Sequence, residues 1–286
     1  MAAAHLIVVP YELDRLRHGV GKGPERLLEG GAAEALGAAG LEVETRIVEV
    51  DQEHDNETDA CFDLIGRVAG TVAEARRDGA FPVVVSGSCC HAALGVSAGL
   101  AEERLGVVWF DAHGDFNEPS TAVYGYFDGM PLATLTGGAW QALATEVPGF
   151  RPVPETAVVL AGARAFDPPE ERRLDASAIT RVSSLELAEP RQLTAAIENL
   201  RPVPTSIYLH LDLDVLDSGD GEVNVYSAAG GVSESELEAA VAAVLDGFEV
   251  RALSLTAFDP ERDRPARVPP LAARLLSALA ERLGSN

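Results

Sequence analysis

The chain has 286 residues, with 45 acidic against 22 basic side chains and a formal net charge of −23. This balance argues against a nucleic-acid partner, because proteins that bind phosphates depend on clustered Lys and Arg. It favours a small-molecule substrate that is cationic or neutral. Hydrophobic residues make up 47% and charged residues 23% of the chain, which excludes disorder as its main state.

No apolar run reaches the roughly 18–20 residues needed to cross a bilayer, and residues 1–10 lack a basic region ahead of their short apolar stretch. We therefore expect a cytoplasmic protein without a membrane partner. Two of the three cysteines, Cys89 and Cys90, are neighbours. So few cysteines in a chain of this length predict thiols rather than a disulfide framework.

Short apolar, β-branched runs alternate with amphipathic segments, as is typical of a parallel sheet covered by helices. In chain order we expect strands at 6–9, 42–50, 82–86, 105–111, 157–162, 179–182, 206–211 and 251–256. The clearest helices are expected at 24–39, 59–78, 233–248 and 269–283. The chain has no internal repeat, charge block or linker rich in Pro, Gly and Ser. The sequence therefore predicts one α/β domain over residues 1–286.

Residues 114–138 form the longest stretch without clear periodicity, and they follow the strand expected to end at Asp111. In parallel α/β sheets, ligands bind beyond the carboxyl ends of the strands. Functional residues are therefore expected in this stretch.

Side chains of metal-binding types follow two of the expected strands at a spacing of two residues. They are Asp111, His113 and Asp115 at the end of the first strand and Asp212 and Asp214 after the second, with Asp217 three residues beyond Asp214. Alternate side chains of an extended chain share a face, and clustered carboxylates are unfavourable unless a cation neutralises them. The pattern predicts two divalent ions that activate a shared water. The alternative is that both motifs only cap turns.

These motifs resemble those of the ureohydrolases, the family of arginase, agmatinase and formimidoylglutamase. Residues 111–117 are similar to the family's D-A-H-x-D-x-N motif, and residues 212–217 to its D-x-D-x-x-D motif. Weaker similarities at 19–24, 129–131 and 230–233 extend the resemblance over most of the chain. The resemblance implies a three-layer α/β/α fold around an eight-stranded, mainly parallel sheet. It also implies a homo-oligomer, either a trimer or a hexamer.

The resemblance further implies two manganese ions and a role for each matching residue. Asp111 and Asp212 would bridge the ions, and His113 and Asp214 would complete the ligands of one ion. Asp115 would bind the other ion and hold the bridging hydroxide. The substrate-binding positions are matched by Asn117, Asp167 and Tyr124.

One metal-ligand motif departs from the family pattern. G-G-D-H reads Gly87-Ser88-Cys89-Cys90 here, and Leu94-Gly95 downstream sets a register in which Cys90 replaces the His ligand, as in the hydroxyarginine hydrolase of cycloserine biosynthesis. Because a thiolate is softer than an imidazole, zinc or iron becomes possible beside manganese. His91 is the ligand if the register shifts, and the alternative is that both thiols are ordinary buried residues.

The substrate-facing positions depart further. The catalytic His that arginases place before G-M-P is Asp128, which can shuttle a proton, recognise a cationic group or cap the turn. The Glu that binds the guanidinium falls at Ala257, and neither Asp259 nor Glu261 is in register to replace it. The two hydroxyl positions that bind an amino-acid carboxylate fall at Ala122 and Tyr124. Arginine itself is therefore disfavoured as the substrate.

These observations lead us to expect a binuclear metallohydrolase that cleaves a C–N bond in a linear amidine, guanidino or related amide compound through a metal-bridging hydroxide. A formimidoyl or other acyl substrate remains open, because the guanidinium partner is missing. Asp115 would stabilise the intermediate, and Asp128 or His210 would protonate the leaving amine. His210 is otherwise a packed, hydrogen-bonded residue. The competing hypothesis is a non-catalytic metal-binding homologue with a scaffold or regulatory role.

Overall fold

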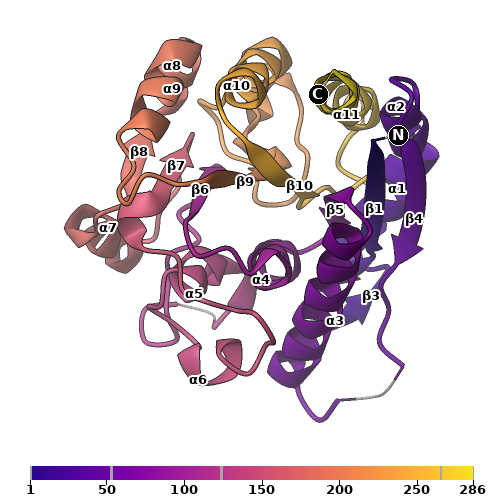
Figure 1. Cartoon of the computed structure of the whole chain (residues 1–286). Helices are drawn as coiled ribbons and strands as arrows, with labels where there is room; N and C mark the ends of the chain where they lie inside the picture. The colour runs from indigo at the N-terminus through magenta and orange to yellow at the C-terminus, as the bar shows by residue number, and fades with distance from the viewer. Residues whose placement is uncertain (1, 52–53, 123–124, 265, 286) are drawn as a thin grey trace.

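The computed structural model describes residues 2–51, 54–122, 125–264 and 266–285. Its centre is an eight-stranded sheet in which all paired strands are parallel, in the order β4-β1-β5-β10-β9-β6-β7-β8 (Figure 1). The strands are β1 (Ala3–Val9), β4 (Glu42–Ile47), β5 (Ala80–Ser86), β6 (Leu105–Phe110), β7 (Val158–Ala161), β8 (Thr180–Val182), β9 (Ser206–Asp212) and β10 (Val250–Thr256). A short hairpin of β2 (Tyr11–Glu12) and β3 (Arg15–Leu16) follows β1. The expected sheet is confirmed.

Two inner strands, β6 and β9, are buried along their whole length because helices cover both faces of the sheet. All residues of β6 and β9 are buried, which is why they read in the sequence as continuous apolar runs rather than as alternating ones. At the edge of the sheet, β4 is largely exposed, and it ends at Ile47 rather than at residue 50.

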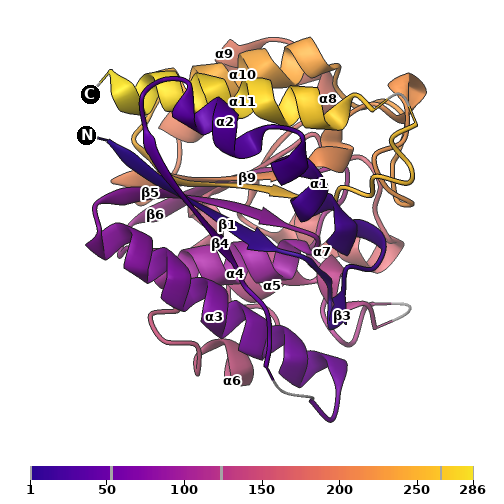
Figure 2. The same ribbon diagram turned by 90° about the vertical axis from the view of Figure 1, so that its right-hand side faces the viewer.

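Helices cover the two faces of the sheet in separate layers (Figures 1 and 2). One layer holds α3 (Glu57–Arg77), α4 (Cys89–Leu100), α5 (Pro131–Leu135), α6 (Gln141–Ala144) and α7 (Pro168–Ala176). The other holds α1 (Gly23–Glu29), α2 (Ala32–Gly37), α8 (Ser184–Leu187), α9 (Pro190–Glu198), α10 (Glu234–Gly247) and α11 (Val268–Gly284). Within β1, Ile7 and Val9 pack toward the first layer, whereas Leu6 and Val8 pack toward the second.

The expected helix at 24–39 is wrong as one element. The chain breaks between α1 and α2 at Gly30 and Gly31, and Gly31 has a φ of 95°, a conformation that favours glycine. The other three expected helices lie within two residues of α3, α10 and α11, and α10 begins with a capping box between Ser233 and Glu236. No helix in the described ranges is both long and apolar enough to cross a bilayer.

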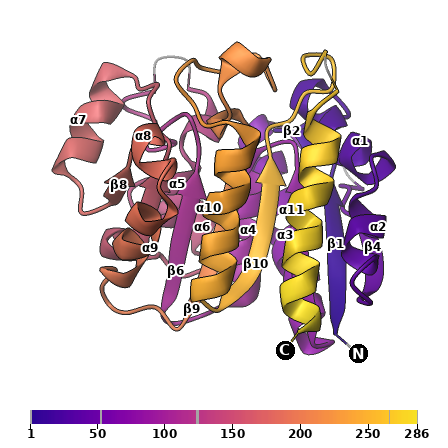
Figure 3. The same cartoon turned by 90° about the horizontal axis from the view of Figure 1, so that it is seen from above.

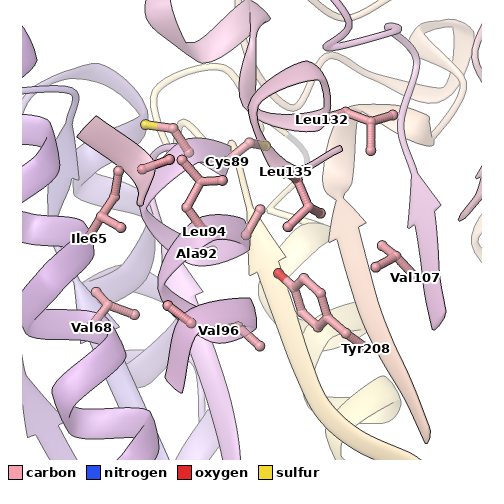
Figure 4. Close-up of a cluster of buried hydrophobic side chains, with 14 of the residues drawn as sticks. Ile65, Val68, Cys89, Ala92, Leu94, Val96, Val107, Leu132, Leu135 and Tyr208 are labelled. Carbon is pink, nitrogen blue, oxygen red and sulfur yellow. The ribbon is translucent and has the colours of Figure 1, made fainter. Parts of the chain in front are cut away.

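Helix α4 carries no amphipathic signal, because every one of its residues is buried. It lies between α3 and the sheet, with Ile65 and Val68 on one side and Val107 and Tyr208 on the other (Figure 4). A side chain at Gly95 would meet Val68 Cγ1 at 2.5 Å, so the two helices approach closely. This packing fixes where α4 begins, at the carboxyl end of β5. Figure 3 shows β10 pointing to the edge where the long connecting loops gather.

Candidate metal centre

A pocket of about 340 Å³ opens where β6, β9 and β10 end and α4 begins, which is large enough for a small organic ligand. Its described lining residues are Val20, Cys89, His113, Asp115, Asn117, Ala122, Tyr126, Asp128, Gly129, Ala165, Phe166, Asp167, Glu170, Asp212, Asp214, Asn224, Tyr226 and Ala257. Six of these are carboxylic acids, and His113 is the one basic side chain among them. A pocket of this composition favours a cationic or neutral ligand.

The exit of β6 positions three of the expected ligands. Trp109 Nε1 donates to Asp111 Oδ2 at 2.9 Å, and the His113 amide donates to Asp111 Oδ1 at 2.7 Å, so both oxygens of Asp111 are held. The chain does not stay extended to Asp115, which has a φ of 48°. This left-handed backbone conformation, which is uncommon in residues other than Gly or Asn, turns the side chain of Asp115 into the pocket.

The exit of β9 positions the other two carboxylates. Asp212 Oδ1 accepts a hydrogen bond from the Asp214 amide at 2.8 Å, and Asp214 Oδ1 accepts one from the Ala112 amide at 3.1 Å. The second bond joins the loop after β9 to the loop after β6, two neighbouring strands. Asn224 Nδ2 also donates to Asp214, at 3.3 Å. Each carboxylate is therefore oriented by a neighbour before any ligand binds.

These residues form two groups of potential metal ligands that share Asp111. Cys89, Asp111 and Asp212 form one group, and Asp111, His113 and Asp214 form the other, with the ligand atoms of each group within 4.8 Å of one another. Carboxylate, imidazole and thiolate are ligands of divalent first-row metals. The donor set therefore fits two ions, which Cys89, Asp111, His113, Asp212 and Asp214 would hold. Asp115 belongs to neither group but lines the same pocket.

The structure places Cys89, rather than the expected Cys90, at the pocket. Cys89 Sγ lies 3.0 Å from Asp212 Oδ2 and 3.0 Å from Thr256 Oγ1, and Cys89 lines the pocket, whereas Cys90 groups with Cys61. Ser88 is the N-cap of α4 and Cys89 its first residue, so the side chain of Cys90 is turned about 100° away along the helix.

The site concentrates negative charge. Burial, followed by repulsion from neighbouring carboxylates, raises the pKa of Asp115 and of Asp212 well above the usual range. Although burial opposes both shifts, the hydrogen bonds of His113 lower the pKa of Asp214 and raise the pKa of His113 itself to about 12. A bound cation would relieve this repulsion, because it lets all the carboxylates ionise together.

The carboxylate of Asp128 lies beside the first two residues of α4. It accepts hydrogen bonds from the Cys89 amide at 3.2 Å and the Cys90 amide at 2.8 Å, which places negative charge where the helix dipole favours it. Burial nevertheless raises the pKa of Asp128 to about 6. Asp128 thus both caps the helix and presents an acid to the pocket.

The expected substrate-binding residues Asn117 and Asp167 both line the pocket, as do Ala122 and Ala257. Tyr124 lies outside the described residues. Neither of the two acids considered as substitutes for the guanidinium-binding Glu lines the pocket: Asp259 accepts a bond from the Glu261 amide, and Glu261 pairs with Lys22 at the surface. Neither Asp259 nor Glu261 therefore replaces the carboxylate missing at Ala257.

His210 lies beneath the pocket and does not line it. Its ring stacks on Trp109 with centroids 3.8 Å apart, and its Nδ1 lies 2.8 Å from Tyr208 Oη and 2.9 Å from Ser254 Oγ. Burial lowers the pKa of His210 to about 3. This arrangement is that of the packed, hydrogen-bonded histidine considered as the alternative to a catalytic role.

The sequence did not predict several residues that line the pocket. Glu170 accepts hydrogen bonds from the Phe116 and Asp167 amides, and Asn224 joins Asp214 to the Ala257 carbonyl. The rings of Tyr126 and Tyr226 lie 5.8 Å apart at the pocket. Glu170 had one signal in the sequence, because it lies three residues after Asp167, a spacing that is typical of a capping box. The others lie in loops without a pattern.

Comparisons with known proteins agree with this geometry. The model of the Arginase family matches residues 2–280. The chain is 29% identical to an arginase of Bacillus caldovelox, with 98% of each chain covered, and 30% identical to an arginase of Brevibacillus brevis, with 96% of each covered. A crystal structure of arginase from Bacillus subtilis superposes with a TM-score of 0.87 at 26% identity, covering 97% of this chain and 98% of that one.

Proposed function

Because the chain belongs to the arginase family, we propose that it is a binuclear metal-dependent hydrolase that cleaves a C–N bond of a linear amidine or guanidino compound. The observation that carries this proposal is the pair of ligand groups that share Asp111 and whose other four members line one acidic pocket. Five ordered ligands, four of them buried and His113 half-buried, are costly to maintain without an ion. They are Cys89, Asp111, His113, Asp212 and Asp214.

We propose manganese for both positions, with zinc or iron as the alternative at the position that Cys89 contributes to. The group with His113 offers an imidazole and carboxylates, which suit manganese. The group with Cys89 replaces a nitrogen donor by sulfur, which shifts its preference toward softer ions. The two positions therefore differ in metal preference.

When bound, the two ions would supply an activated water close to the trigonal carbon of the substrate. Side chains of the protein would hold the water, protonate the leaving group and orient the substrate. Asp115 would accept a hydrogen bond from the attacking water, and Asp128 would donate a proton to the leaving amine, since a carboxyl group with a pKa of about 6 is protonated often enough near neutral pH to act as an acid. Asn117 and Asp167 would orient the substrate from the rim.

We propose a substrate without a free α-carboxylate. The described lining residues include no Lys or Arg that could pair with one, and the lining acids not assigned to the ions, Asp128, Asp167 and Glu170, would disfavour it. The amino-acid carboxylate that an arginase accommodates thus has no counter-charge here. A decarboxylated guanidino compound or a simple amidine carries only positive charge, which this pocket attracts.

The test compares agmatine with arginine, which differ by that carboxylate alone, using the protein purified without chelators and supplied with manganese. We expect release of urea with a higher kcat/KM for agmatine, and loss of turnover in Asp212→Asn. Faster hydrolysis of arginine would overturn the substrate class. Two bound ions with no turnover of any guanidino, amidine or formimidoyl compound would favour the non-catalytic homologue.

We also propose that the protein is a cytoplasmic homo-oligomer, a trimer or a hexamer. Support comes from family membership and from large apolar side chains at the surface, such as Leu185, which is 88% exposed. Light scattering coupled to gel filtration measures the assembly, and cell fractionation measures the location. A monomer at micromolar concentration would overturn the assembly.

A further inference from the structure

A second cluster of metal-binding side chains lies in the α3/α4 interface, apart from the pocket. It consists of Cys61 of α3 and of Cys90 and His91 of α4, and their ligand atoms lie within 4.8 Å of one another. All three side chains are fully buried, and none lines the pocket. We call these three residues the interface cluster.

His91 supplies an independent observation. Neither Nδ1 nor Nε2 of His91 has a hydrogen-bond partner, although both are buried. The other histidine buried to the same extent, His210, has Tyr208 and Ser254 as partners. Buried polar atoms are nearly always satisfied, so an orphaned ring needs an explanation. Since a ring nitrogen of His91 lies close to both thiols, an ion between the three would satisfy it.

The donor set identifies the kind of ion. Two thiolates and one imidazole are soft ligands that suit zinc, whereas manganese prefers oxygen. A divalent ion with two thiolates and a neutral imidazole carries no net charge, so the complex can be buried at small electrostatic cost. The acidic pocket has the opposite character, with carboxylates predominating.

We propose that the interface cluster holds one zinc ion, distinct from the ions of the pocket. This ion would join α3 to the first turn of α4. It would thereby fix the position of Cys89, which precedes Cys90 and faces Asp212 on the other side of the same turn. Because the cluster has no exposed ligand atom, the ion would enter during folding and resist chelators that strip the open pocket.

The experiment measures retained zinc. The full-length protein is produced with zinc in the medium, dialysed against EDTA in the native state, and analysed for zinc per chain by mass spectrometry. Asp212→Asn is the common background, because it weakens the pocket ions. We expect one zinc per chain to remain in this background and after the further change Cys89→Ser. We expect its loss after Cys61→Ser, the matched removal of a thiol in the interface cluster.

A second measurement guards against misfolding of the Cys61→Ser protein. X-ray absorption at the zinc edge of the dialysed background protein should show two sulfur ligands and a histidine nitrogen. Oxygen and nitrogen ligands alone would overturn the proposal, as would the absence of retained zinc or its equal retention in a folded Cys61→Ser protein. In Cys89→Ser, which retains only Cys61 and Cys90, the absence of a titratable thiol in the denatured, unreduced chain would indicate a Cys61–Cys90 disulfide, which also excludes the zinc site.

Discussion

Cys89 Sγ lies 3.0 Å from Asp212 Oδ2, although 123 positions of sequence separate the two residues. The contact reaches from the first residue of α4, past the end of β10, to the end of β9. Thr256 Oγ1, at the end of β10, is also 3.0 Å from the thiol. Two strand ends and one helix start thus converge on this thiol, and the position of a metal ligand depends on how α4 is packed.

The two neighbouring cysteines should behave differently toward the pocket ions. We expect Cys89→Ala to weaken one pocket ion by more than about tenfold, because it removes a ligand atom. Cys90→Ala should leave the affinity of the pocket ions nearly unchanged, since the thiol of Cys90 faces Cys61. Calorimetric titration with manganese measures the affinity of the pocket ions in both variants. Equal weakening in the two variants would mean that Cys90 also binds a pocket ion.

Gly87, in the turn between β5 and α4, should tolerate no side chain. A Cβ at this position would meet the Tyr11 carbonyl oxygen at 2.2 Å and Gly21 Cα at 2.7 Å, both backbone atoms. We expect Gly87→Ala to destabilise the protein by about 1–3 kcal/mol and to weaken metal binding by displacing Cys89.

Gly70 provides the matched control for this substitution. It lies within α3, and a Cβ there would meet nothing within 4 Å. Gly70→Ala should therefore stabilise the protein by about 0.5–1 kcal/mol, as alanine does inside a helix. Chemical denaturation measures both variants, and similar effects of the two changes would refute the close approach at Gly87.

The sequence predicted the sheet and the two ligand-bearing loops because their signals are local. A buried strand followed by Asp and His two apart positions its side chains through the chain itself, as at Asp111 and His113. Cys89 could not be assigned in this way, because the packing of α4 decides which of two adjacent thiols faces the pocket. Helix α4 itself gave no periodic signal, since it is buried all round. Asn224 reaches Asp214 only through tertiary structure.

Asp128 and His210 were both considered as proton donors, and we expect their substitutions to differ in their effects on kcat and on stability. Asp128→Asn should lower kcat by about 10²- to 10⁴-fold with little change in stability, because an amide cannot donate the proton but retains an oxygen that can cap α4. His210→Gln should instead lower stability by about 1–3 kcal/mol, because it breaks bonds to Tyr208 and Ser254.

The kcat of His210→Gln should stay within about tenfold of the parent value, since the ring lies below the pocket rather than in it. Steady-state kinetics and thermal denaturation of the same preparations provide both readouts. A folded His210→Gln protein with a kcat as low as that of Asp128→Asn would assign the proton transfer to His210.

Glu170 should make stability depend on pH. Burial raises the pKa of Glu170 to about 7, although its bonds from the Phe116 and Asp167 amides oppose the shift. A carboxyl group whose pKa is higher in the folded state binds its proton more tightly there. Its contribution to stability is therefore complete below about pH 4.5, its unfolded value, and is lost as the pH rises through 7.

Glu170→Gln removes this titration while keeping the size of the side chain. Relative to the parent protein, the variant should gain on the order of 1–2 kcal/mol of stability between pH 5 and pH 8. Chemical denaturation of chelator-treated protein across this range measures the difference. Glu171→Gln, at an exposed neighbouring position of α7, is the control and should follow the parent curve. If the stability of Glu170→Gln also changes with pH in parallel with that of the parent, Glu170 is ionised in the folded protein throughout. The hydrogen bonds from the amides of Phe116 and Asp167 then outweigh its burial.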